Sequence, residues 1–322
     1  MILSIIIPVY NVEKYIERCL KSIIYQNFDC NDVELIVVID GSKDASYDIC
    51  KQILKNFQNK KIIYQDNKGL SGARNTGLIN AKGDYVWFVD SDDTLEENAI
   101  VDFIEQVSKK NHDLVRFCFK FCLNNDKILK YYFSNIQKEN SVLLDRNDYI
   151  NSANFKPMSW LYIYKRNFLL EKNLFFWEGI LHEDEEYIVR VLCCVETVFL
   201  INKVLYNYYE NKGSIMTVFK PKSTFDKLLI VKKYEELIAL ENLDDNLIQF
   251  INKRVYVFYL TILNPSIFYK HTKKERKLIL NELKFSLFYP FNNLNGLGFK
   301  EKIYKMLINF SILLYVNLRR IV

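Results

Sequence analysis

The stretch Gly83-Asp84-Tyr85-Val86-Trp87-Phe88-Val89-Asp90-Ser91-Asp92-Asp93-Thr94 decides how the rest of the chain is interpreted. Five apolar or aromatic residues run directly into three carboxylates, and a run this short predicts a strand buried on both faces. Carboxylates this close repel one another unless a cation lies between them, and a divalent ion bound through oxygen atoms is one candidate. The alternative is an acidic turn that caps a helix beginning near Leu95.

Length and composition place few limits on the function. The 322 residues suffice for one large domain or two modest ones, and a 50% hydrophobic content supplies an ample core. The chain carries 44 basic and 39 acidic side chains, and the net charge of +5 is too small to indicate nucleic-acid binding.

Cysteine and histidine usage points to a cytoplasmic protein without a zinc site. The seven cysteines include no CxxC pair and lie mostly in apolar patterns, so we expect reduced thiols. The three histidines are far apart, which argues against zinc. We also expect no signal peptide and no membrane-spanning segment.

The first third of the chain alternates between predicted strands and helices. We expect strands at 3–9, 33–39, 61–64 and 85–89, and helices at 12–24, 45–57, 73–81 and 96–109, the third of them opened by a glycine-bearing loop at 67–72. This spacing predicts βαβ units and a mostly parallel sheet, in which ligands bind beyond the carboxyl ends of the strands. Polar residues gather at those ends, at Tyr10 and Asn11, at Asp40 and at Asp90–Asp93, and so predict a binding crevice.

The pattern changes after residue 113. Strands are predicted at 114–122 and 128–133 around a turn at 124–126, a helix at 188–194 and a strand at 198–209. A second acidic group, 182–186, precedes that helix, and helical periodicity dominates from 219 onward. We therefore expect three parts, at 1–113, at 114–217 and, helical, at 218–322.

The last segment, 299–322, is basic and amphipathic. Its lysines and arginines flank apolar residues, so the segment either lies on an anionic membrane surface or packs as a core helix. We favour the membrane, which predicts a cytoplasmic protein bound peripherally to the inner face of the plasma membrane.

Four motifs in the first 95 residues occur in an order that resembles a known family. They are Ile5-Ile6-Ile7-Pro8-Val9-Tyr10-Asn11, Val38-Ile39-Asp40-Gly41-Ser42-Lys43-Asp44, Asn67-Lys68-Gly69-Leu70-Ser71-Gly72-Ala73-Arg74-Asn75 and Asp90-Ser91-Asp92-Asp93. Together they resemble the family 2 glycosyltransferases of the GT-A fold, whose second acidic motif is similar to Glu183-Asp184. One position departs from the pattern, because Ile39 replaces the first of two aspartates that often precede the glycine.

The resemblance implies transfer of a sugar from a UDP-sugar with inversion at the anomeric carbon. It also implies that 1–113 is the nucleotide-sugar-binding half of the GT-A domain and that 114–217 is its acceptor-binding half. Its motif positions imply that the donor is bound by Pro8, Tyr10, Asp40, Arg74, Asp90, Ser91 and Asp92. Within this set, the first three residues would line the uracil, Arg74 would reach the nucleotide and Asp90 would face the ribose. Asp92, helped by Asp93, would hold Mn²⁺ or Mg²⁺, and Asp184 would be the general base. Further candidates for the acceptor site or a closing loop are Trp160, His182, Glu183 and Lys212.

Two separate acidic clusters suit a single-displacement reaction. A divalent cation neutralises the charge that develops on a diphosphate leaving group, and a carboxylate within reach takes the proton of the attacking hydroxyl. For Asp184, the alternative is that 183–186 are only the acidic first turn of a helix, which the helix dipole favours, and Glu183 or Glu185 is the next candidate base. For Trp160, core packing is an equal alternative.

Two other functions stay open at this point. One is a non-catalytic nucleotide-sugar-binding partner subunit, against which the intact Asp92 and Asp184 argue. The other is a metal-dependent nucleotidyltransferase, which would need a glycine-rich, lysine-containing loop where residues 10–13 stand. The resemblance therefore implies a hexosyl- or N-acetylhexosaminyltransferase, which we expect to extend a lipid-linked oligosaccharide for a capsule, O-antigen or exopolysaccharide.

Overall fold

The computed structural model describes residues 1–107, 111–123, 127–132, 141–152, 155–210, 219–240, 242–292, 294 and 297–321. The chain divides into two compact units. The first contains Met1–Gly179 and Glu183–Ser214, and the second contains Ile180–His182 and Ile215–Val322. Both predicted halves of the glycosyltransferase domain thus fall mainly in the first unit.

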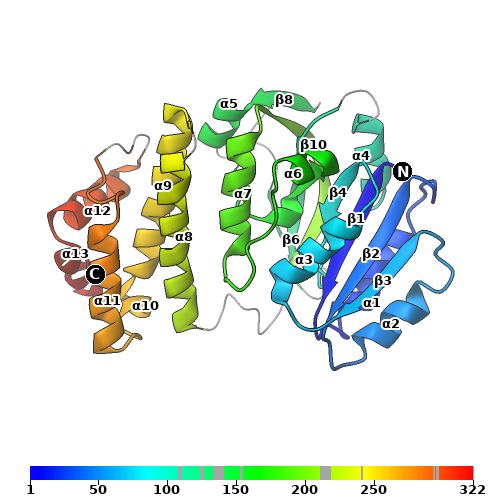
Figure 1. Cartoon of the computed structure of the whole chain (residues 1–322), viewed down its shortest axis with the longest axis horizontal. Helices are drawn as coiled ribbons and strands as arrows, with labels where there is room; N and C mark the ends of the chain where they lie inside the picture. Colours follow the sequence, from blue (N-terminus) through cyan, green and yellow to red (C-terminus); the bar gives the residue numbers. More distant parts are fainter. Residues whose placement is uncertain are drawn as a thin grey trace. The chain divides into compact units, whose positions relative to one another are not determined.

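The first unit is built on one mixed sheet (Figure 1). Its strands are β1 (Leu3–Val9), β2 (Val33–Asp40), β3 (Lys60–Gln65), β4 (Tyr85–Phe88), β5 (Thr94–Leu95), β6 (Leu114–Leu123), β7 (Ile128–Tyr132), β8 (Val142–Asp145), β9 (Tyr162–Lys165) and β10 (Thr197–Glu210). They follow the order β3-β2-β1-β4-β9-β6-β10-β5, with β7 beside β6 and β8 beside β10.

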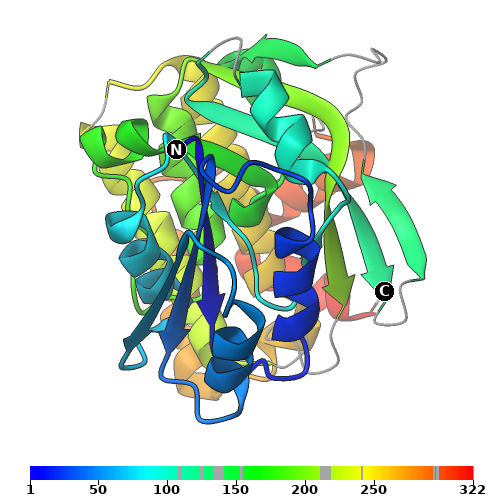
Figure 2. The same ribbon diagram turned by 90° about the vertical axis from the view of Figure 1, so that its right-hand side faces the viewer.

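Parallel pairing is confined to two parts of this sheet. The strands β3, β2, β1 and β4 are parallel to one another, and β6 is parallel to β10. Figure 2 shows β1, β2 and β3, in blue, side by side. Antiparallel β9 lies between β4 and β6 and joins the two parallel parts. The predicted α/β class with a central sheet flanked by helices is confirmed.

The helices of the first unit form where apolar residues recur at helical spacing. In α1, Ile16, Cys19, Leu20 and Ile23 are all buried. The helices and one 3₁₀ turn, η1, have the following bounds: α1 (Ile16–Ile24), α2 (Ser46–Ile53), α3 (Gly69–Asn80), α4 (Ala99–Val107), α5 (Arg146–Asn151), η1 (Ser159–Leu161), α6 (Arg166–Glu171) and α7 (Glu183–Cys194).

Strand β4 is the doubly buried strand that the opening stretch predicts. All four of its residues are buried between β1 and β9. Its entry is fixed by Gly83, where an added Cβ would lie 2.6 Å from the backbone nitrogen of Ser4. The Gly83 N–H donates to the Ser4 hydroxyl and to the buried Glu34 carboxylate. These hydrogen bonds hold the start of β4 against β1, and the acidic turn follows at the other end of β4.

Three local expectations were wrong. No helix begins near Leu95, because Thr94 and Leu95 pair with β10 as β5 and α4 begins only at Ala99. The acidic turn is therefore not a helix cap. Helix α3 begins at Gly69 instead of residue 73. Within it, residue 77 must be glycine, because a Cβ there would lie 2.2 Å from the Ile6 side chain. Helix α7 begins at Glu183 instead of residue 188, so the second acidic group forms its first turn.

The second unit is helical. Its helices are α8 (Pro221–Leu240), α9 (Asp245–Ile262), α10 (Pro265–Phe268), α11 (Lys273–Phe285), α12 (Phe299–Phe310) and α13 (Ile312–Ile321). The amphipathic segment predicted at 299–322 is two helices, and Ile308, Ile312, Tyr315 and Val316 within it are buried. Within the described residues, no helix is long and apolar enough to cross a membrane.

Candidate active site

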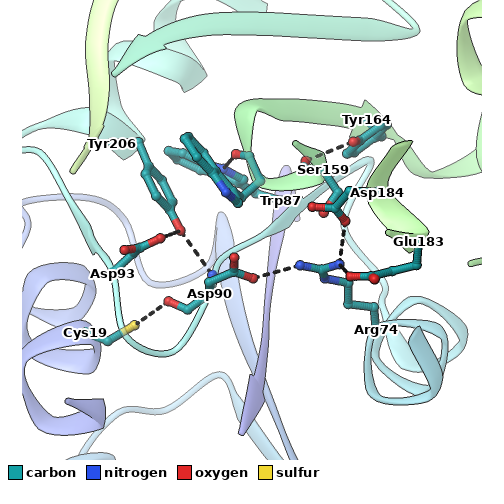
Figure 3. A network of polar contacts seen from close by, with 11 residues as sticks. Cys19, Arg74, Trp87, Asp90, Asp93, Ser159, Tyr164, Glu183, Asp184 and Tyr206 are labelled. Carbon is teal, nitrogen blue, oxygen red and sulfur yellow. Dashed lines mark hydrogen bonds and ion pairs between the residues drawn. The ribbon is translucent and has the colours of Figure 1, made fainter. Parts of the chain in front are cut away.

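The buried guanidinium of Arg74, on α3, connects the two acidic motifs (Figure 3). One terminal nitrogen, Nη2, donates to Asp90 Oδ1 at 2.8 Å, just past the end of β4. The other, Nη1, donates to Asp184 Oδ1 at 2.7 Å and to Glu183 Oε1 at 3.2 Å, in the first turn of α7. Arg74 is only 1% exposed, so three carboxylates from distant parts of the sequence surround one buried cation.

This arrangement shifts the pKa values of the groups involved. Burial acts to lower the pKa of Arg74, but Asp184, Asp90 and Glu183 together raise it above its usual value. Burial raises the pKa of Asp90 to about 6, against the opposing effect of Arg74. Burial and the neighbouring Asp184 charge also raise the pKa of Glu183. The Arg74 guanidinium thus faces three carboxylates, and the excess negative charge favours a bound proton or a second cation nearby.

Asp93 is held by β10. Its Oδ2 accepts from the Tyr206 hydroxyl and its Oδ1 from the Tyr209 N–H, both at 2.8 Å. Burial and the nearby Asp92 and Asp90 raise the pKa of Asp93 well above its usual range. Because both oxygens accept hydrogen bonds from β10, the geometry favours a structural role for Asp93.

The backbone of the acidic turn is tied down as well. The Asp90 N–H donates to the Tyr206 hydroxyl at 3.1 Å. The Asp92 carbonyl accepts from Arg18 Nη2 at 2.9 Å, and the Arg18 guanidinium lies 3.6 Å from the centre of the Tyr209 ring. The backbone of the turn is therefore held by α1 on one side and by β10 on the other.

The predicted uracil-binding residues follow the first two strands. Strands β1 and β2 end together, with Val9 opposite Ile39, so Tyr10 and Asp40 lie at the same edge of the sheet. Tyr10 is 51% exposed, whereas Asp40 is buried and its Oδ1 accepts from Gln65 Nε2 and the Lys68 N–H. Pro8 is buried within β1, and Ser91 is buried in the acidic turn.

The acceptor candidates have different surroundings. Trp160 is 2% exposed and stacks on Tyr206 with ring centroids 4.3 Å apart, which favours the packing alternative. His182 belongs to the second unit, where its Nε2 lies 2.7 Å from the Ser223 hydroxyl. Glu183 lies on Arg74, as described above. Lys212 is outside the described residues.

Sequence reasoning missed the contributions of Tyr206 and Arg18. Tyr206 is more than 110 positions away from the two aspartates that it contacts. The only signal was the aromatic character of the strand predicted at 198–209. In the sequence, Arg18 occupies a polar position of an amphipathic pattern, where a basic residue is ordinary and indicates no contact.

Comparison with known proteins identifies the family. The family model described as Glycosyl transferase family 2 matches residues 4–165, which is half of the chain. The chain belongs to glycosyl transferase family 2. It is a glycosyltransferase by family, which removes the nucleotidyltransferase alternative.

Individual relatives of this glycosyltransferase agree with that assignment. It is 35% identical over 228 residues to Glycosyltransferase GlyA of Streptococcus pneumoniae, a match that covers 68% of this chain but only 32% of GlyA. It is 32% identical over 248 residues to the uncharacterized glycosyltransferase EpsJ of Bacillus subtilis, covering 75% of this chain and 70% of EpsJ. The crystal structure of S. aureus TarS 1-349 with UDP-GlcNAc is similar at a TM-score of 0.77 and 21% identity, over 99% of this chain and 90% of that one. The fold is therefore GT-A.

Proposed function

We propose that this glycosyltransferase moves a sugar from a UDP-sugar to a hydroxyl of a glycan acceptor, with inversion at the anomeric carbon. The observation that carries the proposal is the Arg74 bridge, which joins Asp90 of the first acidic motif to Glu183 and Asp184 of the second. Complexes of TarS with UDP-GlcNAc and with UDP support a uridine nucleotide as the donor.

Asp184 is the general base in this proposal. It takes the proton of the acceptor hydroxyl while that oxygen forms a bond to the anomeric carbon. The bond from that carbon to the diphosphate oxygen breaks on the opposite face, and its electron pair leaves with UDP. Arg74 holds the Asp184 carboxylate in a fixed place, and Glu183, on the same guanidinium nitrogen, is the alternative base.

The donor lies along the carboxyl ends of β1, β2 and β4. Tyr10 offers an exposed ring to the uracil, and the Asp40 carboxylate accepts a hydrogen bond from the base. Asp90 faces the ribose. Both terminal nitrogens of Arg74 donate to carboxylates of the two motifs, so in this proposal Arg74 acts as a positioning residue for them.

A divalent cation, Mn²⁺ or Mg²⁺, fits the Asp92 end of the site. The described residues contain no group of three or more ligating side chains, so Asp92 would share the ion with the donor diphosphate and water. One or two carboxylates plus substrate phosphates is the usual way in which proteins hold Mg²⁺ at such sites. When bound, the ion would neutralise charge on the leaving diphosphate.

The acceptor is a glycan, and we propose a lipid-linked one at the inner membrane surface, as in the synthesis of a surface polysaccharide. The basic composition of the last two helices supports this placement. It is a separate claim from sugar transfer, and it is tested separately below.

The test is a panel of UDP-sugars, each with and without Mn²⁺, scored by thermal stabilisation of the full chain and by release of UDP. A donor at a hundredfold excess over its Kd stabilises the fold by about 2.7 kcal/mol. We expect one or a few UDP-sugars to give both signals in a metal-dependent way. The matched GDP-sugars serve as controls, and a response to GDP-sugars alone contradicts the proposed donor.

A further inference from the structure

Helix α12 carries two apolar faces. Its inner face packs within the helical unit, where Ile308 is fully buried and Tyr304 meets Tyr315 edge-on at 5.3 Å. The Tyr256 hydroxyl of α9 donates to the carbonyl of Glu301 at 2.8 Å, which fixes the helix from the same unit. These contacts leave the opposite side of α12 facing outward.

That outward side is an apolar stripe. Phe299, Ile303, Met306 and Phe310 follow one another at intervals of four, three and four residues, which places them on one face of a helix. They are 83%, 38%, 64% and 80% exposed. Ile308 comes nine residues after Phe299, at about 180° from it around a helix of 3.6 residues per turn, so the stripe and the packing face are opposite.

Charged residues are distributed unevenly around the stripe. Lys300 and Lys302 are exposed on its two sides, about 100° and 60° from Phe299 around the helix. The glutamate of α12, Glu301, lies about 160° away from Phe299 and accepts from the Gly298 N–H. With Lys305, three lysines and one glutamate give the helix a net charge of +2.

We infer that the stripe of α12 inserts into the headgroup region of an anionic lipid bilayer, with Lys300 and Lys302 contacting the lipid phosphates. An exposed apolar stripe costs free energy in water and normally marks an interaction surface. A helix with an apolar face flanked by lysines binds anionic membranes in the plane of the interface, and the lysines favour this partner over an uncharged protein groove. The inference deepens the proposed membrane association, but it does not depend on sugar transfer.

The test is sedimentation of the full chain with vesicles of phosphatidylcholine alone or mixed with phosphatidylglycerol. The wild type should bind the mixed vesicles, and binding should fall as salt rises. The triple variant Phe299→Ser, Met306→Ser, Phe310→Ser should lose at least ~10-fold in binding, because each change removes apolar area from the inserted face. The matched control Leu229→Ser, Leu240→Ser, Leu278→Ser removes exposed apolar residues from α8 and α11 and should bind as the wild type does.

A second pair of variants tests the charges. Lys300→Glu with Lys302→Glu should lose about 10-fold on the anionic vesicles, whereas Lys273→Glu with Lys274→Glu, the same charge change on α11, should lose little. Circular dichroism checks the fold of every variant, and UDP release from donor alone checks the active site independently of the membrane.

Two results overturn the inference. One is that the triple serine variant binds anionic vesicles as tightly as the wild type. The other is that the wild type ignores vesicles but self-associates in analytical ultracentrifugation, and that the triple variant is monomeric. In that case, the stripe is an interface between copies of the chain. Loss of UDP release with intact vesicle binding would instead count against the proposed enzyme function.

Discussion

The acidic turn after β4 and the acidic first turn of α7 both concentrate carboxylates, yet they use them differently. In the turn, Asp93 is held by Tyr206 and Tyr209, and Asp90 contacts Arg74. In the helix, Glu186 pairs with Arg190 four residues on, while Glu183 and Asp184 both contact Arg74.

The comparison shows that charge density alone does not identify a functional acid. Asp93 in the turn and Glu186 in the helix have structural partners, the first on β10 and the second within α7. Asp90, Glu183 and Asp184 contact the buried guanidinium of Arg74. We therefore propose that Asp184 takes the proton and that Arg74 holds the two clusters together, and we keep Asp92 as the proposed metal ligand.

The largest expected effect comes from Asp184→Asn. Removing a general base slows proton transfer by about 10²–10⁴-fold, so the turnover number for transfer should fall by that factor. The control is Asp113→Asn, which neutralises an exposed carboxylate elsewhere in the first unit and should keep wild-type turnover. If Asp184→Asn retains full turnover while Glu183→Gln loses it, the base is Glu183.

The next largest effect is that of Arg74→Ala on stability. The substitution leaves Asp90, Glu183 and Asp184 partly buried without their cation, which should lower the free energy of unfolding by about 3–5 kcal/mol. Urea unfolding of both proteins measures the difference. Arg190→Ala is the contrast, because it removes the partner of one carboxylate, Glu186, and of the Phe175 carbonyl: it should lose less stability and keep the metal response of the donor site. Equal losses of activity in both variants would contradict the role of Arg74 in holding the two acidic clusters together.

A smaller effect is expected from pH. Because burial raises the pKa of Asp90 to about 6, this carboxyl gains a proton as the pH falls through that value. The protonated carboxyl no longer balances the positive charge of Arg74, so kcat/KM should decline below about pH 6. The pH dependence of kcat/KM reports the pKa values of the free enzyme. In Asp90→Asn the overall rate should be lower and this decline should move to lower pH. A wild-type profile that stays level down to about pH 5 contradicts the assignment.

Much of the donor half could be predicted because its information is local. The strands Leu3–Val9 and Val33–Asp40 are mostly apolar runs, and polar residues that mark the crevice stand at their carboxyl ends. The acidic turn and Arg74 were recognisable as motif positions from their neighbours in sequence.

The rest depends on pairings between distant residues. Strand β9 enters the sheet between β4 and β6, and Thr94–Leu95 pairs with β10, which no local pattern indicates. The same holds for the site, because the hydrogen bond from Tyr206 to Asp93 and the contacts of Arg74 with three carboxylates are tertiary contacts. The sequence indicated the acidic residues, but it did not predict which of them make structural contacts within the protein.

The separate roles of the two acidic clusters, metal binding and proton transfer, are tested most directly by calorimetry. A UDP-sugar is titrated, with and without Mn²⁺, into three variants. Asp184→Asn should bind the donor with wild-type affinity and the full response to metal. Asp93→Asn, which keeps an acceptor for the Tyr209 N–H, should retain most of that response, whereas Asp92→Ala should lose it. The account is contradicted if Asp92→Ala responds to Mn²⁺ as the wild type does, or if the response disappears in Asp184→Asn.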